Sequence, residues 1–226
     1  MSLGLLLALR VSFGLLLVGA MLFIPAGTWR FWQAWVFLAV VFPVLAGAFV
    51  YLYRYDRSLL ESRLRGREKI REQRHLIRWL RPVFFAALLL PGLDYRLGWS
   101  RHWLGAAAPW LCLTFDGVIL ASLLLVLWVL RVNSFASRTI EIQSGQKVIS
   151  SGPYALVRHP MYLGSIVMLL SVPLALGSYL TLPAFALVTP FYVYRLLNEE
   201  KFLRRELPGY PEYCARTRFR LVPFLW

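Results

Sequence analysis

Long stretches without charge alternate with short basic segments along the whole chain. Charged residues are absent from Val11–Trp29, Phe31–Tyr53, Pro82–Leu93 and His159–Tyr194, and His102–Leu130 contains a single one, Asp116. A helix needs about 20 apolar residues to cross the roughly 30 Å hydrocarbon core of a bilayer. The 36 residues of the last run therefore predict two short membrane spans, which fold back at Gly177 and Ser178.

The pattern predicts an all-α fold, a polytopic membrane helical bundle with five or six transmembrane helices. The alternatives differ at Pro82–Trp99, which either crosses the membrane or is partly re-entrant. No low-complexity linker and no internal repeat divides the chain, so residues 1–226 are expected to form a single membrane domain. Within its first half, the basic segment 54–81 is either an interfacial amphipathic helix or a solvated loop.

The amino-acid composition and the distribution of charge also indicate a membrane protein. The chain is 59% hydrophobic, and a soluble domain of this size would expose that surface and aggregate. The net charge of +14 could indicate a nucleic acid partner. However, six spans with a cytoplasmic N-terminus place 22 of the 25 Lys and Arg residues inside. This asymmetry explains the charge without nucleic acid, and it predicts that both termini are cytoplasmic.

The segment GPYALVRHPMYLGS, Gly152 to Ser165, joins a Gly-Pro turn to the start of an apolar helix. It places Arg158 and His159 directly before Pro160, which is typical of a first helical position. Free N–H groups and a partial positive charge make a helix N-terminus attractive to anions. The segment is therefore a candidate anion site at the membrane surface, although Arg and His also flank spans simply to reach lipid headgroups.

A second candidate is the pair Glu199-Glu200 at the end of the last apolar helix. The helix dipole disfavours a carboxylate there. The negative charge should therefore be balanced either by a bound ligand or by nearby cations (Arg195, Lys201, Arg204). Because the two motifs flank one helical hairpin, its antiparallel helices should bring them together. Adjacent helical residues point about 100° apart, so one of the two glutamates should face the pocket; the sequence leaves open which.

Other kinds of site find little support. There is no G-x-G-x-x-G, no P-loop and no H-E-x-x-H, and the three histidines are too dispersed for a metal site. Asp116 is either functional or paired with Arg96 or Arg101. The two cysteines do not indicate a disulfide.

The residues GPYALVRHPMYLG and NEEKFLRRELPGYPEYCARTRFRLVP resemble the isoprenylcysteine carboxyl methyltransferase family, whose wider group includes phospholipid N-methyltransferases. The resemblance covers roughly residues 130–226. It implies an integral-membrane enzyme that uses S-adenosyl-L-methionine in a cytoplasmic cofactor pocket, while a lipophilic acceptor enters from the bilayer. Residues 131–226 would then be the catalytic half and 1–130 the membrane half.

The resemblance also assigns residues. Arg158, His159 and Glu200 are the expected catalytic residues. The expected cofactor-binding residues are Tyr154, His159, Pro160, Tyr162, Leu163, Gly164, Glu199 and Glu200. The sequence does not decide whether the acceptor is a prenylcysteine carboxylate, a phospholipid amine or a thiol. An NADPH-dependent sterol-type membrane reductase and a non-enzymatic membrane protein are the alternatives.

Overall fold

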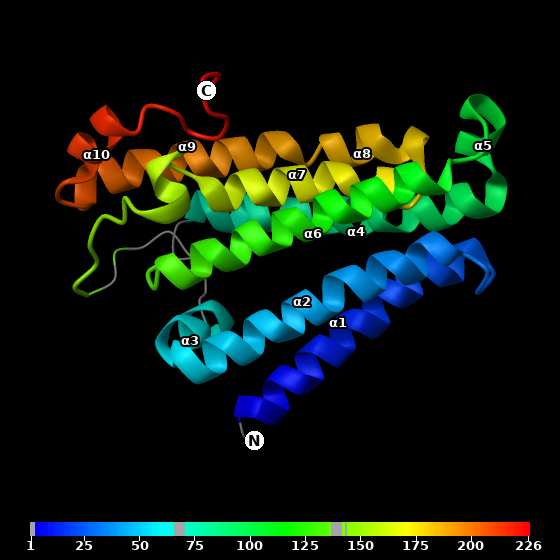
Figure 1. Cartoon of the computed structure of the whole chain (residues 1–226), viewed down its shortest axis with the longest axis horizontal. Coiled ribbons are helices and arrows are strands. Elements are labelled where there is room, and N and C mark those ends of the chain that lie inside the picture. The colour runs from blue at the N-terminus through cyan, green and yellow to red at the C-terminus, as the bar shows by residue number, and fades with distance from the viewer. Residues whose placement is uncertain (1–2, 66–70, 137–141, 143) are drawn as a thin grey trace.

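The computed structural model describes residues 3–65, 71–136, 142 and 144–226, and it consists of helices joined by turns and loops (Figure 1). The long helices are α1 (Leu3–Ala26), α2 (Trp32–Tyr55), α4 (Arg71–Leu97), α6 (Pro109–Val132), α7 (Pro160–Ala175) and α9 (Thr189–Glu206). The short elements are α3 (Arg57–Arg65), α5 (Trp99–Leu104), η1 (Gly152–Ala155), η2 (Tyr179–Thr181), α8 (Leu182–Ala186) and α10 (Tyr210–Arg216). No strand occurs among these residues, so the expected all-α membrane bundle is confirmed.

Four helical stretches are long and apolar enough to cross a membrane: Leu3–Ala26, Trp32–Tyr55, Pro109–Val132 and Tyr179–Glu206. The helix α7 is equally apolar but has only 16 residues. Most of the expected span at Pro82–Trp99 is the second part of α4, which begins at Arg71, contains two prolines and ends at Leu97, whereas Trp99 begins α5. The first span begins earlier than Val11 and includes the exposed Arg10, whose long side chain can snorkel toward the interface.

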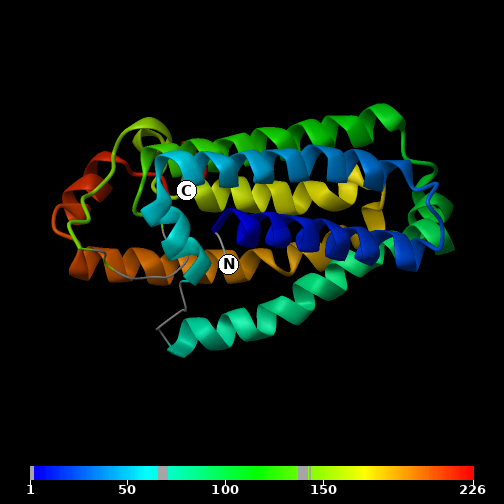
Figure 2. The ribbon, with the colours of Figure 1, turned by 90° about the horizontal axis from the view of Figure 1, so that it is seen from below.

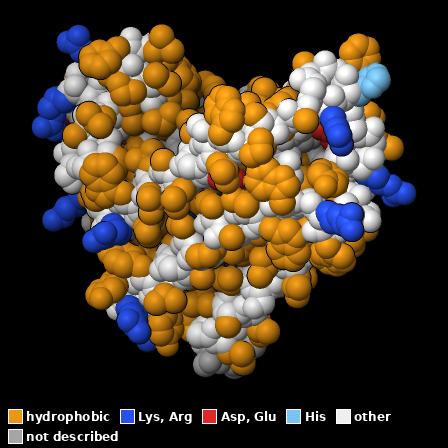
Figure 3. Space-filling view, turned by 45° about the vertical axis from the view of Figure 1, so that its right-hand side comes forward, with side chains coloured by type: hydrophobic (Ala, Val, Ile, Leu, Met, Phe, Trp, Pro, Cys, Tyr) orange, Lys and Arg blue, Asp and Glu red, His pale blue; other side chains and the backbone are white. Residues whose placement is uncertain are grey.

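The outer surface of the bundle suits a lipid environment. Figure 3 shows hydrophobic side chains across most of one face, with Lys and Arg at its margins. Exposed tryptophans lie near both ends of the bundle, where aromatic side chains favour the membrane–water interface: Trp29, Trp103 and Trp110 at one end and Trp79 and Trp128 toward the other. The protein is therefore an integral membrane protein.

The packing order sets up the two ends of the bundle. The helix α7 packs along α6, α6 packs along α2, and α1 packs against both α2 and α4. The end of α6, the start of α7 and the end of α9 consequently lie at the same end of the molecule, together with α3 and α10 (Figure 1). The turn between α1 and α2 and the helix α5 lie at the opposite end.

Part of the basic segment 54–81 forms α3; residues 66–70 lie outside the described part of the chain. Asp56 caps this helix, because its Oδ1 accepts a hydrogen bond from the Leu59 backbone N–H at 3.0 Å; this is the usual role of an Asp at this position. Leu59 and Leu60 are buried against leucines of α1, α2 and α6. The helix is therefore amphipathic, and it is held against the bundle.

Two glycines allow close packing. A Cβ atom at Gly92 of α4 would collide with the Leu22 carbonyl oxygen of α1, so glycine is required where these helices touch. Gly177 has a φ of +67° in the turn between α7 and η2, a conformation that glycine adopts without strain. The expected fold-back at Gly177 and Ser178 is confirmed.

A buried hydrogen-bond cluster fastens the end of the bundle near α5. Asp94 accepts hydrogen bonds from the Ser100 backbone N–H at 2.7 Å, from the Ser100 hydroxyl at 2.6 Å and from the Ser178 hydroxyl. The Ser100 hydroxyl oxygen accepts another from the Leu180 N–H at 2.9 Å. We call this set the Asp94 cluster. It joins α4 and α5 to the turn that follows α7.

Candidate functional site

A cavity of about 400 Å³ lies at the end of the bundle where α6 and α9 end and α7 begins. This volume falls within the roughly 300–1,000 Å³ of small-molecule sites. The start of α7 contributes Pro160, Met161 and Tyr162 to its wall, and α9 contributes Tyr192 and Glu199. The cavity is lined by both regions that the sequence singles out, so the hairpin does bring the two motifs together.

The segment before α7 places Tyr154 in the cavity wall. The Asn133 side chain at the end of α6 donates a hydrogen bond to the Tyr154 hydroxyl at 2.8 Å. The Tyr213 hydroxyl donates to the Tyr154 carbonyl oxygen, also at 2.8 Å. Tyr154 is thereby fixed from two sides, by α6 and by α10.

Arg158 also borders the cavity, but its guanidinium is engaged by protein groups. Its Nη1 donates to the carbonyl oxygens of Thr217 and Arg218 at 3.0 and 2.9 Å. Its Nε and Nη2 donate to both oxygens of Glu200 at 3.1–3.2 Å. Every nitrogen of this guanidinium therefore donates to an acceptor within the chain. Arg158 fastens the tail after α10 to the end of α9.

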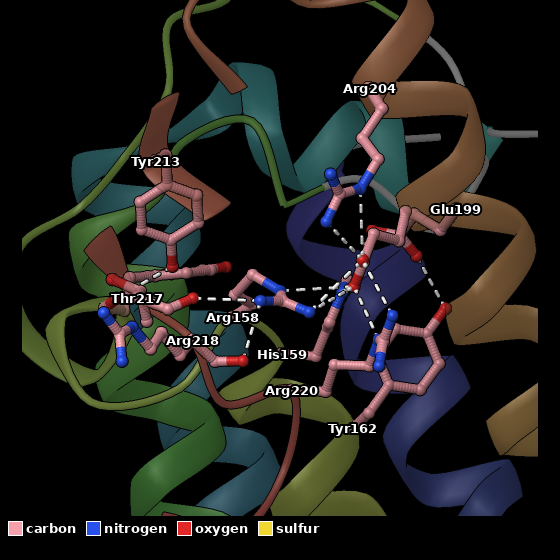
Figure 4. A network of polar contacts seen from close by, with 11 residues as sticks. Arg158, His159, Tyr162, Glu199, Arg204, Tyr213, Thr217, Arg218 and Arg220 are labelled. Carbon is pink, nitrogen blue, oxygen red and sulfur yellow. Dashed lines mark hydrogen bonds and ion pairs between the residues drawn. The ribbon is translucent and has the colours of Figure 1, made fainter. Parts of the chain in front are cut away.

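Glu200 is the buried carboxylate at the centre of a charge cluster whose other members are labelled in Figure 4. Its side chain is 4% exposed and contacts the guanidinium groups of Arg158, Arg204 and Arg220 at 3.0–3.2 Å, and His159 Nε2 at 3.4 Å. We call these five residues the Glu200 cluster. A buried carboxylate needs such compensation, because removal from water strongly disfavours its charged form.

The side chain of Glu199 points in a different direction from that of Glu200. Of these two glutamates, Glu199 lines the cavity. Tyr162 on α7 donates a hydrogen bond to Glu199 Oε2 at 2.6 Å. The ring of His159 meets the Tyr162 ring edge to face, with centroids 5.8 Å apart. The two glutamates thus divide their roles: Glu199 faces the cavity, and Glu200 holds together the protein behind it.

Three tyrosines of the cavity wall stay neutral at ordinary pH. Burial raises the pKa of Tyr154 to about 12, against the smaller opposing effect of the Asn133 hydrogen bond. Burial likewise raises the pKa of Tyr210 and that of Tyr213 well above the usual range. These side chains can donate hydrogen bonds and present aromatic faces, but they do not supply a phenolate base.

The structure places the other expected residues as follows. His159, Pro160 and Tyr162 line the cavity, whereas Leu163, Gly164 and Glu200 are not among its lining residues. A Cβ atom at Gly164 would lie 3.1 Å from the Ser122 carbonyl oxygen, so this glycine faces α6. The close backbone approach that Gly164 permits is therefore made to a neighbouring helix.

Several lining residues were not anticipated from the sequence. Among them are Arg63 of α3, Ile77 and Leu80 of α4, and Lys147 and Val148 of the loop before η1. None lies in a recognisable motif. Arg63 could have been suspected, since it follows Leu59 and Leu60 by four and three residues and so belongs to the buried face of α3.

The comparison with known proteins points to the same part of the chain as the two motifs. Residues 111–208 match the family described as phospholipid methyltransferase. The matched segment runs from the start of α6 to just beyond the end of α9. It includes both motifs but leaves out α1 to α5 and the tail after Pro208.

Two curated relatives match part of the chain. The chain is 33% identical to the Delta(14)-sterol reductase TM7SF2 of Mus musculus over 91 residues, which cover 39% of this chain and 22% of the reductase. It is 32% identical to the cobalt-zinc-cadmium resistance protein CzcN of Cupriavidus metallidurans over 114 residues, 46% of this chain and 51% of CzcN. Each match thus spans about half of the relative or less. Within the described ranges, no three His, Cys, Asp or Glu side chains gather as metal ligands would.

The match with the family model and the position of both motifs at one cavity agree with the resemblance found in the sequence. Residues 111–208 match the phospholipid methyltransferase family, which is related to the isoprenylcysteine carboxyl methyltransferases, so the resemblance is confirmed over this segment.

Proposed function

We propose that the protein is an S-adenosyl-L-methionine-dependent methyltransferase that acts on a lipophilic acceptor, in the manner of isoprenylcysteine carboxyl methyltransferases. The observation that carries the proposal is that the start of α7 and the end of α9, which both lie in the family-matched segment, converge on one cavity. Phospholipid N-methylation and thiol methylation are variants of the same proposal with other acceptors.

The lining residues fit such a cofactor. Tyr210 lines the cavity, and its buried hydroxyl has no hydrogen-bond partner in the described part of the protein, so a ligand can supply one. Glu199 can accept hydrogen bonds from ribose hydroxyls or from an ammonium group. Tyr154 and Tyr213 offer faces on which a purine ring can stack. When bound, the cofactor supplies an electrophilic methyl group on its sulfonium.

The acceptor would reach the cavity from the bilayer. The apolar part of the cavity wall comes from Ile77 and Leu80 of α4 and from Phe191 and Tyr192 of α9. Figure 2 shows that the first part of α4 diverges from α9 toward this end of the molecule, and residues of both helices line the cavity. An acceptor with a long apolar chain suits such a wall.

The chain's own residues would act mainly by positioning, which can contribute most of the rate in a direct displacement. The Glu200 cluster fixes Arg158 and His159, and through them the start of α7. A carboxylate or thiolate acceptor needs no general base. For a protonated acceptor, Glu199 is the carboxylate that lines the cavity in the described ranges.

One experiment separates this proposal from the reductase alternative, which the 33% identity to the sterol reductase favours. The detergent-purified protein is titrated calorimetrically with S-adenosyl-L-homocysteine, the cofactor product, and with NADPH. We expect binding of the former and none of the latter. Binding of NADPH alone would exclude the methyltransferase.

The cavity and both termini are proposed to be cytoplasmic, because 22 of the 25 basic residues then lie inside. Single cysteines at two exposed positions, Glu212 at the cavity end and Ala106 at the opposite end, test this in intact cells. An impermeant maleimide should label the Ala106→Cys variant only. Labelling of Glu212→Cys alone would invert the topology.

A further inference from the structure

An acidic side chain is buried inside α6, toward the end of the bundle away from the cavity. Asp116 follows the helix start at Pro109 by seven residues, so it lies about 10 Å along the helix. It is 3% exposed. Neither of its carboxylate oxygens has a hydrogen-bond partner in the described part of the chain, so the pairing with Arg96 or Arg101 that the sequence suggested is not formed. A buried charge in a membrane span requires compensation.

Three further side chains gather around the same point. Cys112 is completely buried one helical turn before Asp116, on the same face of α6. In the turn after α7, a Cβ atom at Gly177 would lie 3.6 Å from Cys112 Sγ and 3.3 Å from Gln33 Nε2 of α2. The Cys112 thiol also interacts electrostatically with the Asp116 carboxyl and with the Tyr179 phenol of η2. We call Gln33, Cys112, Asp116 and Tyr179 the Asp116 group.

The oxygen atoms of this group share one property. Gln33 Oε1 and the Tyr179 hydroxyl are buried and, like both oxygens of Asp116, have no hydrogen-bond partner among the described residues. Gln33 is only 9% exposed. Native proteins leave few buried polar atoms unpaired. Four such oxygens that come from three segments of the chain therefore indicate a common partner outside the protein.

The chemistry of the oxygens limits what that partner is. A carboxylate and an amide oxygen only accept hydrogen bonds, and a phenol oxygen can accept one, so the partner is a donor or a cation. The group has a single acidic residue, and no three His, Cys, Asp or Glu side chains gather in the described ranges. Divalent cations usually need more charged ligands than this. One positive charge, in contrast, neutralises one buried carboxylate.

We propose that the Asp116 group is a binding site for a small monovalent cation of the Na⁺ type. Asp116 would supply the counter-charge, while the oxygens of Gln33 and Tyr179 would replace part of the hydration shell of the ion. The bound ion would join α6 to α2 and to the turn after α7, and it would stabilise the folded state. The site lies at the opposite end of the bundle from the cavity, so this inference does not depend on the proposed methyl transfer.

The first test compares cations on the detergent-purified parent protein at one fixed pH. Unfolding temperatures are measured in the chlorides of Na⁺, Li⁺, K⁺ and choline at equal ionic strength, so that screening of surface charges is the same. We expect Na⁺ at about tenfold its Kd to raise the unfolding temperature by about 3 °C or more over choline. Radioactive Na⁺ should bind saturably, and choline should not displace it.

Variants assign the cation to the group. Asp116→Asn should abolish the binding of radioactive Na⁺ and the difference between the salts, because the new amide needs no counter-charge. Gln33→Met removes one oxygen at similar volume and should weaken Na⁺ binding by about tenfold. Asp94→Asn is the matched control. It removes another carboxylate that is 3% exposed, but one that accepts hydrogen bonds from Ser100 and Ser178, so it should keep the full response to Na⁺.

Two results would overturn the inference. One is the absence of saturable Na⁺ binding by the parent, because Asp116 would then be a protonated or hydrated acid. The other is undiminished Na⁺ binding by Asp116→Asn or, if that variant does not fold, by Gln33→Met. The binding of S-adenosyl-L-homocysteine is measured separately in choline chloride, so its failure would contradict the methyltransferase and leave the cation site standing.

Discussion

The bundle has a polar cluster around a buried carboxylate at each end, and the two clusters differ in kind. The Asp94 cluster joins a carboxylate to two serine hydroxyls and a backbone N–H. The Glu200 cluster joins a carboxylate to three arginines and a histidine. Each links segments that are far apart in the sequence. Arg158 and His159 of the Glu200 cluster also line a cavity, whereas no residue of the Asp94 cluster does.

The difference shows why buried polarity is weak support for a functional site. Both clusters are needed to satisfy polar groups inside a membrane protein. Beside the Glu200 cluster, additional side chains such as Glu199 and Tyr210 line the cavity. We therefore identify the candidate site from Glu199 and the cavity, and we regard the Glu200 cluster as its support. Four variants test this division, beginning with the largest expected effect.

Glu200→Gln should destabilise the protein most. The variant keeps the shape of the side chain but leaves three arginines without their common counter-charge. Breaking a buried ion pair by removing one partner typically costs about 3–5 kcal/mol. We expect a large drop in the unfolding temperature in detergent and release of the tail that Arg158 and Arg220 hold. A stable Glu200→Gln protein would contradict a supporting role.

Glu199→Gln should affect cofactor binding rather than stability. Loss of a charge-assisted hydrogen bond is worth about 1.5–3 kcal/mol, or roughly 10- to 150-fold in affinity. We expect weaker binding of S-adenosyl-L-homocysteine by calorimetry, with the unfolding temperature close to that of the parent. If the affinity is unchanged, Glu199 does not contact the cofactor.

Arg158→Lys should lower methyl transfer at least tenfold, about 1.4 kcal/mol, with membrane insertion unchanged. Lysine retains the charge, but its single ammonium group cannot replace a guanidinium that donates hydrogen bonds to Glu200 and to two carbonyl oxygens at once. Transfer is followed with radiolabelled S-adenosyl-L-methionine in membranes. Full activity of this variant would show that methyl transfer does not depend on the Arg158 guanidinium.

Asp94→Asn should have the smallest effect, about 1 kcal/mol of stability. The remaining carbonyl oxygen can still accept from the Ser100 N–H, and the serine hydroxyls can rotate to accept from the new amide. We expect a slightly lower unfolding temperature and an unchanged affinity for S-adenosyl-L-homocysteine. A loss of that affinity would show that the two ends of the bundle are coupled.

The sequence was sufficient for the all-α bundle and for the meeting of the two motifs, because charge-free runs and a helical hairpin follow from local pattern. It was not sufficient for the roles of individual residues. The divergence of Glu199 and Glu200 follows from helical geometry, but which one faces the cavity depends on where α7 and the tail pack. The spacing of Arg63 from Leu59 and Leu60 places it on the apolar face of α3, but its position in the cavity wall also depends on contacts between leucines far apart in the sequence.

The tail that Arg158 holds has a consequence for the order of assembly. The backbone N–H groups of Arg158 and His159 donate to the carbonyl oxygens of Phe219 and Arg220, both at 2.9 Å. The chain is synthesised from its N-terminus, so α7 enters the membrane before those partners exist. The nascent protein would therefore pass through a stage in which its helices are inserted but the site is still incomplete. The start of α7 could reach its final arrangement only after Phe219 and Arg220 have left the ribosome.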